Sequence, residues 1–172
     1  MAGITHAKVS AISDGADTTL VRPSDWNTEH VGLKIVRKTA DEIVNNSTTL
    51  QDDDHLVLAM AANEVWYVEI YLLVDSSTVA DIKYGFGYPT GCDIKWTYHY
   101  FSSRTDAALL EETNTWNSGT GGTGVVVGLV LCAMVANGAT AGNFTLRWAQ
   151  NTAEASNTKV LTNSFLKAYK LT

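Results

Sequence analysis

Residues 92–100 read Cys-Asp-Ile-Lys-Trp-Thr-Tyr-His-Tyr, and this stretch decides the fold class. Apolar or aromatic side chains occupy every second position, and polar side chains fill the positions between them. A period of two is typical of a β-strand with one buried face. Residues 82–88 alternate in the same way, and only Pro89-Thr90-Gly91 separates the two runs. That spacing is of hairpin length, so we expect the two strands to pair.

Further strands are expected on both sides of this pair. Residues 143–148 alternate again, whereas 65–74 and 125–135 are apolar almost throughout, as expected for central strands covered on both faces. Shorter candidate strands are 35–38, 47–51, 56–60 and 159–171, and only 106–112 looks helical. About eight or nine short strands in one chain fit an all-β, antiparallel sandwich of jelly-roll type.

Composition excludes several classes of protein. The chain has 172 residues, 45% of them hydrophobic and 17% charged, which indicates one globular domain. Its net charge of −6 and pI of about 5.1 make nucleic acid a poor partner, because phosphate would be repelled. The longest apolar stretch, 125–136, is too short to span a bilayer. The first residues lack the apolar core of a signal peptide, so we expect synthesis in the cytoplasm and no membrane partner.

No catalytic, cofactor or metal site is expected. Residues 119–124 contain G-x-G-x-x-G, but a polar segment precedes them and a strand pattern follows, so they indicate an inter-strand loop. Asp52-Asp53-Asp54-His55 lacks the spacing of a calcium loop and is expected to be a solvated turn. No nucleophile motif is present around Cys92. Cys92 and Cys132 are expected to be buried thiols, with a disulfide between them left open.

The chain divides into an N-terminal docking arm, residues 1–33, and a β-sandwich domain, residues 34–172. The arm mixes turn-forming and scattered apolar residues without a sustained period, which favours an extended conformation. Pro23-Ser24-Asp25 is expected to open one helical turn, with Trp26 as a buried anchor. The alternative is that the arm is a first loop lying over the core of its own domain.

Two kinds of tryptophan are expected. Trp66, Trp96 and Trp148 lie within strand patterns and should be part of the core. Trp116 lies instead within the polar segment Glu112–Ser118, which is expected to be a loop. Its side chain is expected either to be exposed, where it would stack on a sugar ring or anchor a partner, or to fold back as a lid on the sandwich.

The opening of the chain resembles a segment found in many structural proteins of tailed bacteriophages, where it precedes varied downstream domains. The residues that carry the resemblance are 4–9, Ile-Thr-His-Ala-Lys-Val, 14–17, Asp-Gly-Ala-Asp, and 20–31, Leu-Val-Arg-Pro-Ser-Asp-Trp-Asn-Thr-Glu-His-Val. Residues 48–53, 62–66 and 80–83 resemble phage virion sandwich domains more weakly. The resemblance implies a virion component without enzymatic activity. It also implies that the arm attaches the protein, with contacts expected from Arg22, Pro23, Asp25, Trp26 and His30.

Two functions are compatible with this resemblance. The first is a capsid decoration (cement) protein that binds the major capsid protein or another virion protein; its trimeric state rests on analogy. The second is a tail-fibre or baseplate adhesin that binds host-surface glycans through exposed aromatic residues such as Trp116. The chain has no repetitive shaft sequence, which counts against a fibre.

Overall fold

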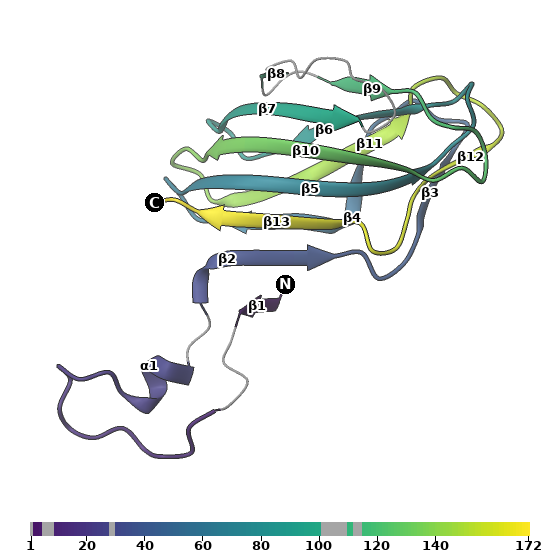
Figure 1. The fold of residues 1–172 in the computed structure, drawn as a ribbon. Coiled ribbons are helices and arrows are strands. Elements are labelled where there is room, and N and C mark those ends of the chain that lie inside the picture. Colours follow the sequence, from purple (N-terminus) through teal and green to yellow (C-terminus); the bar gives the residue numbers. More distant parts are fainter. Residues whose placement is uncertain (1, 5–8, 28–29, 101–109, 112–114) are drawn as a thin grey trace.

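Two antiparallel β-sheets pack face to face and enclose the core (Figure 1). The computed structural model describes residues 2–4, 9–27, 30–100, 110–111 and 115–172. Sheet A contains β1 (Ala2–Ile4), β2 (His30–Arg37), β3 (Glu42–Asn45), β5 (Val65–Asp75), β7 (Asp93–Tyr100), β8 (Leu110–Glu111), β10 (Val127–Ala136), β12 (Asn157–Val160) and β13 (Phe165–Lys170). Sheet B contains β4 (Gln51–Met60), β6 (Ile82–Gly87), β9 (Trp116–Ser118) and β11 (Gly142–Gln150).

The strand order is that of a jelly roll. Sheet A runs β2-β13-β5-β10 through its centre, and sheet B runs β4-β11-β6-β9. Counted along the chain, these strands alternate between the sheets except at β6 and β9, which follow one another in sheet B, and this is the order of a jelly roll made of two Greek keys. β1 extends sheet A beside β2, β7 and β8 extend it beside β10, and β3 and β12 add to one end of β5. The predicted all-β sandwich of jelly-roll type is confirmed.

The predicted hairpin between residues 82–88 and 92–100 is wrong. β6 pairs with β11 and β9 in sheet B, whereas β7 pairs with β10 and β8 in sheet A. Pro89-Thr90-Gly91 therefore carries the chain across the core from one sheet to the other. Alternation shows that a strand has one buried face, but two strands facing each other across a core alternate just as two paired strands do.

Aromatic rings from both sheets meet in the core. Phe86 on β6 contacts Trp96 on β7 edge to face at 5.1 Å, and it contacts Phe144 on β11 at 4.7 Å. Tyr84 lies edge to face with Trp96 at 6.0 Å, and its buried hydroxyl hydrogen bonds with Ser118 on β9. The predicted core tryptophans, Trp66, Trp96 and Trp148, are all at most 2% exposed. These contacts join the two sheets.

Several strand boundaries and environments differ from the predictions. β5 is central, but its side chains alternate between buried and half-buried, so only one of its faces is covered. Residues 47–50 form a loop, while the strand β3 at Glu42–Asn45 has no clear period in the sequence. Residues 159–171 split into β12, a turn and β13. Of the helix expected over 106–112, Leu110–Glu111 is strand β8 and the other residues lie outside the described ones.

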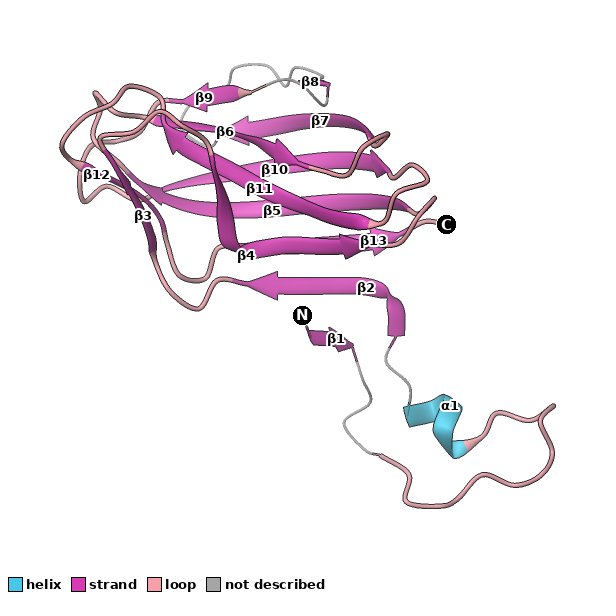
Figure 2. Ribbon diagram, turned by 180° about the vertical axis from the view of Figure 1, so that it is seen from behind, coloured by secondary structure: helices cyan, strands magenta, loops and turns pink. Residues whose placement is uncertain are grey.

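The N-terminal segment leaves the sandwich and returns to the same edge. β1 pairs antiparallel with β2, and β2 begins at His30, inside the region assigned to the arm. Between them, residues 9–27, here called the arm loop, extend away from the sandwich and include the helix α1 (Pro23–Asn27) (Figures 1 and 2). Among the described residues, no helix is long and apolar enough to cross a membrane.

Candidate functional site

The arm loop is held in shape by its own polar side chains. The Asp14 carboxylate accepts hydrogen bonds from the Ser24 hydroxyl at 2.5 Å and from the Ser24 backbone N–H at 2.9 Å. These bonds hold the pKa of Asp14 below its usual value of 3.8. The guanidinium Nε of Arg22 lies 3.8 Å from the same carboxylate. Ser24 and Asp14 thus join two ends of the loop that are ten residues apart.

The helix α1 is capped at its start, although it has only five residues. Pro23 occupies the first helical position, where its fixed φ and missing N–H cost nothing. The Asp25 carboxylate reaches back to the backbone N–H of Arg22 at 2.9 Å, which is the second half of a capping box. The Trp26 N–H donates to the carbonyl of Arg22 at 3.0 Å. The cap fixes the direction in which Trp26 leaves the helix.

Large apolar side chains on the arm loop are exposed. The exposed fraction is 51% for Trp26 and 81% for Val21, and Val9, Ile12 and Leu20 fall between them. The sandwich shows the opposite arrangement, because its large apolar side chains are mostly buried. Five large apolar side chains exposed on one short segment make a candidate surface for contact with a partner. The arm loop is therefore the candidate attachment site.

The structure gives the predicted docking residues different positions. Arg22, Pro23 and Asp25 build the loop and its helix, whereas the Trp26 ring is half exposed. His30 begins β2, and its side chain lies outside the described residues. Trp26 is therefore not a buried anchor within this chain. The alternative of a loop lying over its own core is also contradicted, since residues 9–27 with a described exposure are exposed or half-buried. Leu20 and Val21 are also exposed; they belong to the stretch 20–31 but were not among the contact residues expected from it.

The outer face of sheet A carries a second group of accessible apolar side chains. Tyr67 stacks on Tyr169 at 6.4 Å, and Tyr71 stacks on Phe165 at 5.8 Å. Between these pairs Lys167 and Glu69 form an ion pair at 2.9 Å, and the pKa of Lys167 is raised by its hydrogen bond to Glu69. This face lies over β5 and β13, away from the core.

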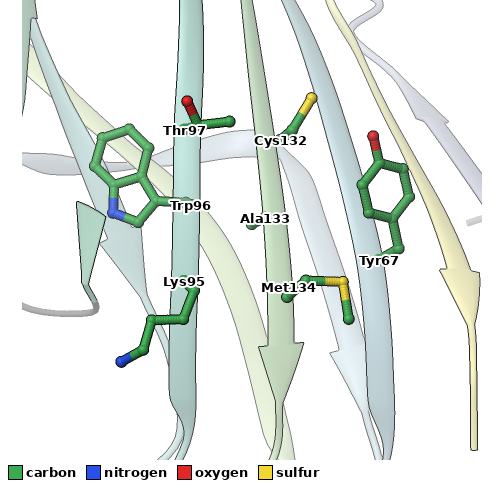
Figure 3. Close-up of a pocket in the computed structure, with 7 residues that line it drawn as sticks. All are labelled: Tyr67, Lys95, Trp96, Thr97, Cys132, Ala133 and Met134. Atoms are coloured by element: carbon green, nitrogen blue, oxygen red, sulfur yellow. The ribbon is translucent and has the colours of Figure 1, made fainter. Parts of the chain in front are cut away.

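A shallow pocket of about 210 Å³ opens beside these rings (Figure 3). It lies across β5, β10 and β7 and is lined by Tyr67, Lys95, Trp96, Thr97, Cys132, Ala133 and Met134. A hydrogen bond with Cys132 raises the pKa of Tyr67 to about 12. Cys132 is half-buried and Cys92 is buried, and no disulfide joins them. The expectation that both thiols are buried is wrong for Cys132.

Trp116 lies in the short strand β9 and not in a loop. Its ring packs against Tyr98 of β7, with centroids 5.3 Å apart, and it remains 38% exposed. Trp116 therefore covers part of the edge between the sheets, as the lid alternative predicted, while one side of the ring stays accessible.

The glycine-rich segment 119–124 is a loop between β9 and β10, as predicted. Thr120 donates its N–H to Asp81 at 2.9 Å, and the Gly124 N–H donates to Asp75 at 2.7 Å. Gly122 and Gly124 have φ values of 103° and 85°, which favour glycine. The loop is tied to the sandwich by these bonds.

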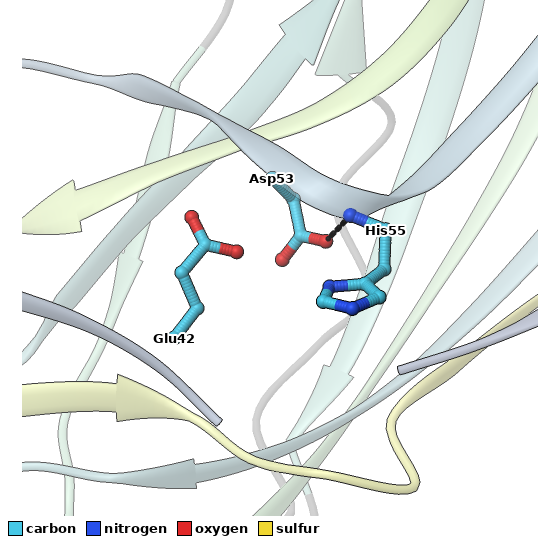
Figure 4. A group of neighbouring side chains, drawn as sticks. All are labelled: Glu42, Asp53 and His55. Atoms are coloured by element: carbon cyan, nitrogen blue, oxygen red, sulfur yellow. Dashed lines mark hydrogen bonds between the residues drawn. The ribbon is translucent and has the colours of Figure 1, made fainter. Parts of the chain in front are cut away.

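The acidic run 52–55 is part of strand β4, so the predicted solvated turn is wrong. Thr145 of β11 pairs with Val57 of β4, and Arg147 of β11 pairs with Asp52 of β4. The extra residues of β4 between these two pairs form a bulge. The bulge turns Asp53 inward, where its carboxylate accepts the backbone N–H of His55 (Figure 4) and also that of Leu56. Counting charges along the sequence does not reveal such a bulge.

Glu42, Asp53 and His55 bring potential metal-ligand atoms within 4.8 Å of one another (Figure 4). The ammonium of Lys38 already lies between the two carboxylates, 2.8 Å from Glu42 and 2.7 Å from Asp53. The Lys38 ammonium thus supplies the positive charge that a metal ion would bring to these carboxylates. The cluster is an internal ion-pair network.

Comparisons with known proteins yield only distant likenesses. No family model matches the chain, and no curated protein matches it. Among solved structures, the tripod (BppUct-A-L) from the baseplate of bacteriophage Tuc2009 has a TM-score of 0.35 and 11% identity, over 98% of this chain and 78% of that one. Two structures of infectious bursal disease virus, of the Gx and Gt strains, have TM-scores of 0.22 at 8% and 11% identity. They match 92% of this chain and 45% of theirs. At these TM-scores the likenesses carry no argument about function.

Proposed function

We propose that this chain is a non-enzymatic structural protein of a tailed-phage virion, attached through its arm loop. The observation that carries the proposal is the exposure of Val21 and Trp26 on a loop whose polar side chains bond to one another. A loop shaped before binding loses less conformational entropy when its apolar side chains are buried against a partner. The resemblance of residues 20–31 to the opening of phage structural proteins gives the class of partner.

The particular role we propose is capsid decoration, with the major capsid protein as partner. The jelly roll would lie on the outer surface of the head and stabilise the junctions between capsomers. Copy number tests this role. Quantitative mass spectrometry of purified virions should give a ratio to the major capsid protein near stoichiometric. A few to a few dozen copies would move the protein to the tail, and its absence from the particle would contradict the virion role altogether.

We also propose a homotrimer that assembles through the outer face of sheet A. In each chain this face would be covered by a neighbouring copy of the chain. This face extends over β2, β13, β5, β10 and β7 and includes the exposed Ile35, Met134 and Tyr169. At about 4.8 Å between strands and 3.3 Å per residue it measures roughly 600 Å², comparable to the ~800 Å² that one partner contributes to a standard interface. Light scattering should give the mass of three chains for the wild type and of one chain for Met134→Lys. A monomeric wild type would contradict the trimer.

A glycan-binding adhesin is the second candidate, because the Trp116 ring keeps an accessible side next to Tyr98. Two matched variants separate the candidates. Trp26→Ala should abolish association with particles and leave glycan binding unchanged if the arm loop docks. Trp116→Ala should do the reverse if the protein is an adhesin. Loss of particle association in Trp116→Ala with normal association in Trp26→Ala would contradict docking through the arm loop.

A further inference from the structure

Lys38 is a fully buried lysine at the end of β2, with an exposed fraction of 0%. Lysine is almost never fully buried, since its flexible stem usually carries the ammonium to water. Here the backbone is fixed on both sides, because the Lys38 N–H donates to Ser164 at 2.8 Å and its carbonyl accepts from Asn163 at 3.1 Å. The side chain is thus held between the sheets.

Two carboxylates contact the Lys38 ammonium. Its Nζ lies 2.7 Å from Oδ2 of Asp53, whose side chain is also 0% exposed, and 2.8 Å from Oε2 of Glu42, which is 10% exposed. Because a C–O bond is about 1.2 Å long, Nζ lies at most about 4 Å from Cγ of Asp53. Amine and carboxyl carbon are therefore held close to the separation from which a bond can form.

The surroundings of Asp53 differ between its two oxygens. Oδ1 accepts the backbone N–H groups of Leu56 at 2.8 Å and His55 at 2.9 Å, while Oδ2 faces Lys38 and the indole N–H of Trp148. Two backbone donors on one oxygen are the arrangement that stabilises the oxyanion of a tetrahedral intermediate. The other oxygen lies beside the amine and is the one positioned to leave.

We propose that Lys38 and Asp53 join in an intramolecular isopeptide bond after folding, with Glu42 as the proton carrier. Glu42 accepts a proton from the ammonium, and the freed electron pair of Nζ forms a bond to Cγ of Asp53. The Cγ–Oδ2 bond then breaks, and its electron pair leaves with the oxygen. Both protons lost by the nitrogen end on Oδ2, which departs as water, and Glu42 is again a carboxylate. Atoms and charge balance without an oxidant or any co-reactant.

Burial favours this bond. The site is enclosed by the core residues Leu56 and Trp148, which are both 0% exposed, so little water is available to hydrolyse an amide once formed. The reaction also removes a buried ammonium and a buried carboxylate, whose desolvation is costly. The partly exposed pairs Lys167–Glu69 and Lys159–Asp75 have no such enclosure and serve as internal controls.

Mass spectrometry of the full-length folded protein tests the bond directly. The chain has no Lys or Arg between Lys38 and Lys83, so trypsin normally releases residues 39–83. With the bond in place, trypsin cannot cleave after Lys38, and the peptide 38–83 appears one water lighter than its sequence. Cyclisation of an aspartate on its own backbone also removes a water, but it leaves Lys38 cleavable. An intact mass equal to that of the sequence, with release of 39–83, would overturn the proposal.

Variants assign the roles. Glu42→Gln keeps the size of the side chain but cannot accept the proton, so this variant should retain the water and be cleaved after Lys38. Lys38→Met should also retain the full mass, whereas the control Lys167→Met should lose one water like the wild type. If a variant does not fold, the wild-type peptide still decides between a bond and an ion pair. A Glu42→Gln protein that folds and loses water normally would remove Glu42 from the reaction.

Discussion

The arm loop and the sandwich use the same residue types in opposite ways. In the sandwich, Trp96 and Trp148 are buried, and on the arm loop Trp26 and Val21 are exposed while Asp14 and Asp25 bond within the loop. A sandwich gains its stability by burying apolar area, so its surface carries the polar groups. A loop of this size cannot enclose a core, and polar contacts hold it while its large apolar side chains stay exposed. The difference teaches that the two regions are held by different contacts, apolar burial in the sandwich and polar bonds in the arm loop.

The largest expected effect is on the sandwich. Trp96→Ala should lower the free energy of unfolding by about 3–5 kcal/mol, because it removes a ring that contacts both Tyr84 and Phe86 and leaves a cavity. Chemical denaturation measures the loss. The same substitution at Trp26 is the control and should shift the free energy of unfolding by less than about 0.5 kcal/mol. Equal losses at both positions would break the distinction between the two regions.

The next effect falls on attachment. Trp26→Ala should abolish detectable association with particles, through a loss of about 2 kcal/mol or more in binding free energy, as expected when a central aromatic anchor is removed from an interface. Co-sedimentation with particles that lack the protein measures the change. Binding at wild-type strength would show that the exposed ring is not an anchor.

A pair of glycines compares the backbone in the two regions. A Cβ at Gly138, which precedes β11, would lie 2.6 Å from the Gly91 carbonyl oxygen, so Gly138→Ala should lower the free energy of unfolding by about 1–3 kcal/mol. A Cβ at Gly15 on the arm loop meets nothing within 4 Å, and Gly15→Ala should leave the unfolding midpoint unchanged. Thermal melts of both variants give the comparison. A Gly138→Ala protein as stable as the wild type would mean that the turns that hold Gly91 and Gly138 can move apart.

The smallest effect concerns the order of the arm loop in acid. The pKa of Asp14 is lowered by its bonds to Ser24, so these bonds stabilise the loop above the usual aspartate pKa of 3.8 and are lost as the pH falls through the lower folded value. An NMR titration of the Ser24 amide should therefore show a midpoint below 3.8. Asp14→Asn is the control and should show no such step. A midpoint at or above 3.8 would remove the Asp14–Ser24 bonds from the account of the loop.

The sequence predicted the strands better than their partners. Alternation found β6, β7 and β11 because each has one face in the core. It paired β6 with β7 because a short turn joins them, although the chain crosses between sheets there. The sequence also predicted β5 to be covered on both faces. The outward-facing positions of β5 hold tyrosines and a leucine, so apolar residues occupy both faces of the strand and no period of two is visible.

The candidate sites show the same limit. The sequence named Arg22, Asp25 and Trp26 together, and only the structure separates Arg22 and Asp25, which shape the loop, from Trp26, which is exposed. The cluster of Lys38, Glu42 and Asp53 had no signal in the sequence. Its members come from the end of β2, from β3 and from a bulge in β4.

The sequence by itself determined the all-β class and the core tryptophans, because these depend on local period and composition. The tertiary structure decided which strands share a sheet, which side of the arm loop is accessible, and how Lys38 reaches Asp53. These features depend on contacts between segments far apart in the chain. Such contacts form when two apolar faces meet across a core, and a local pattern contains no record of which face meets which.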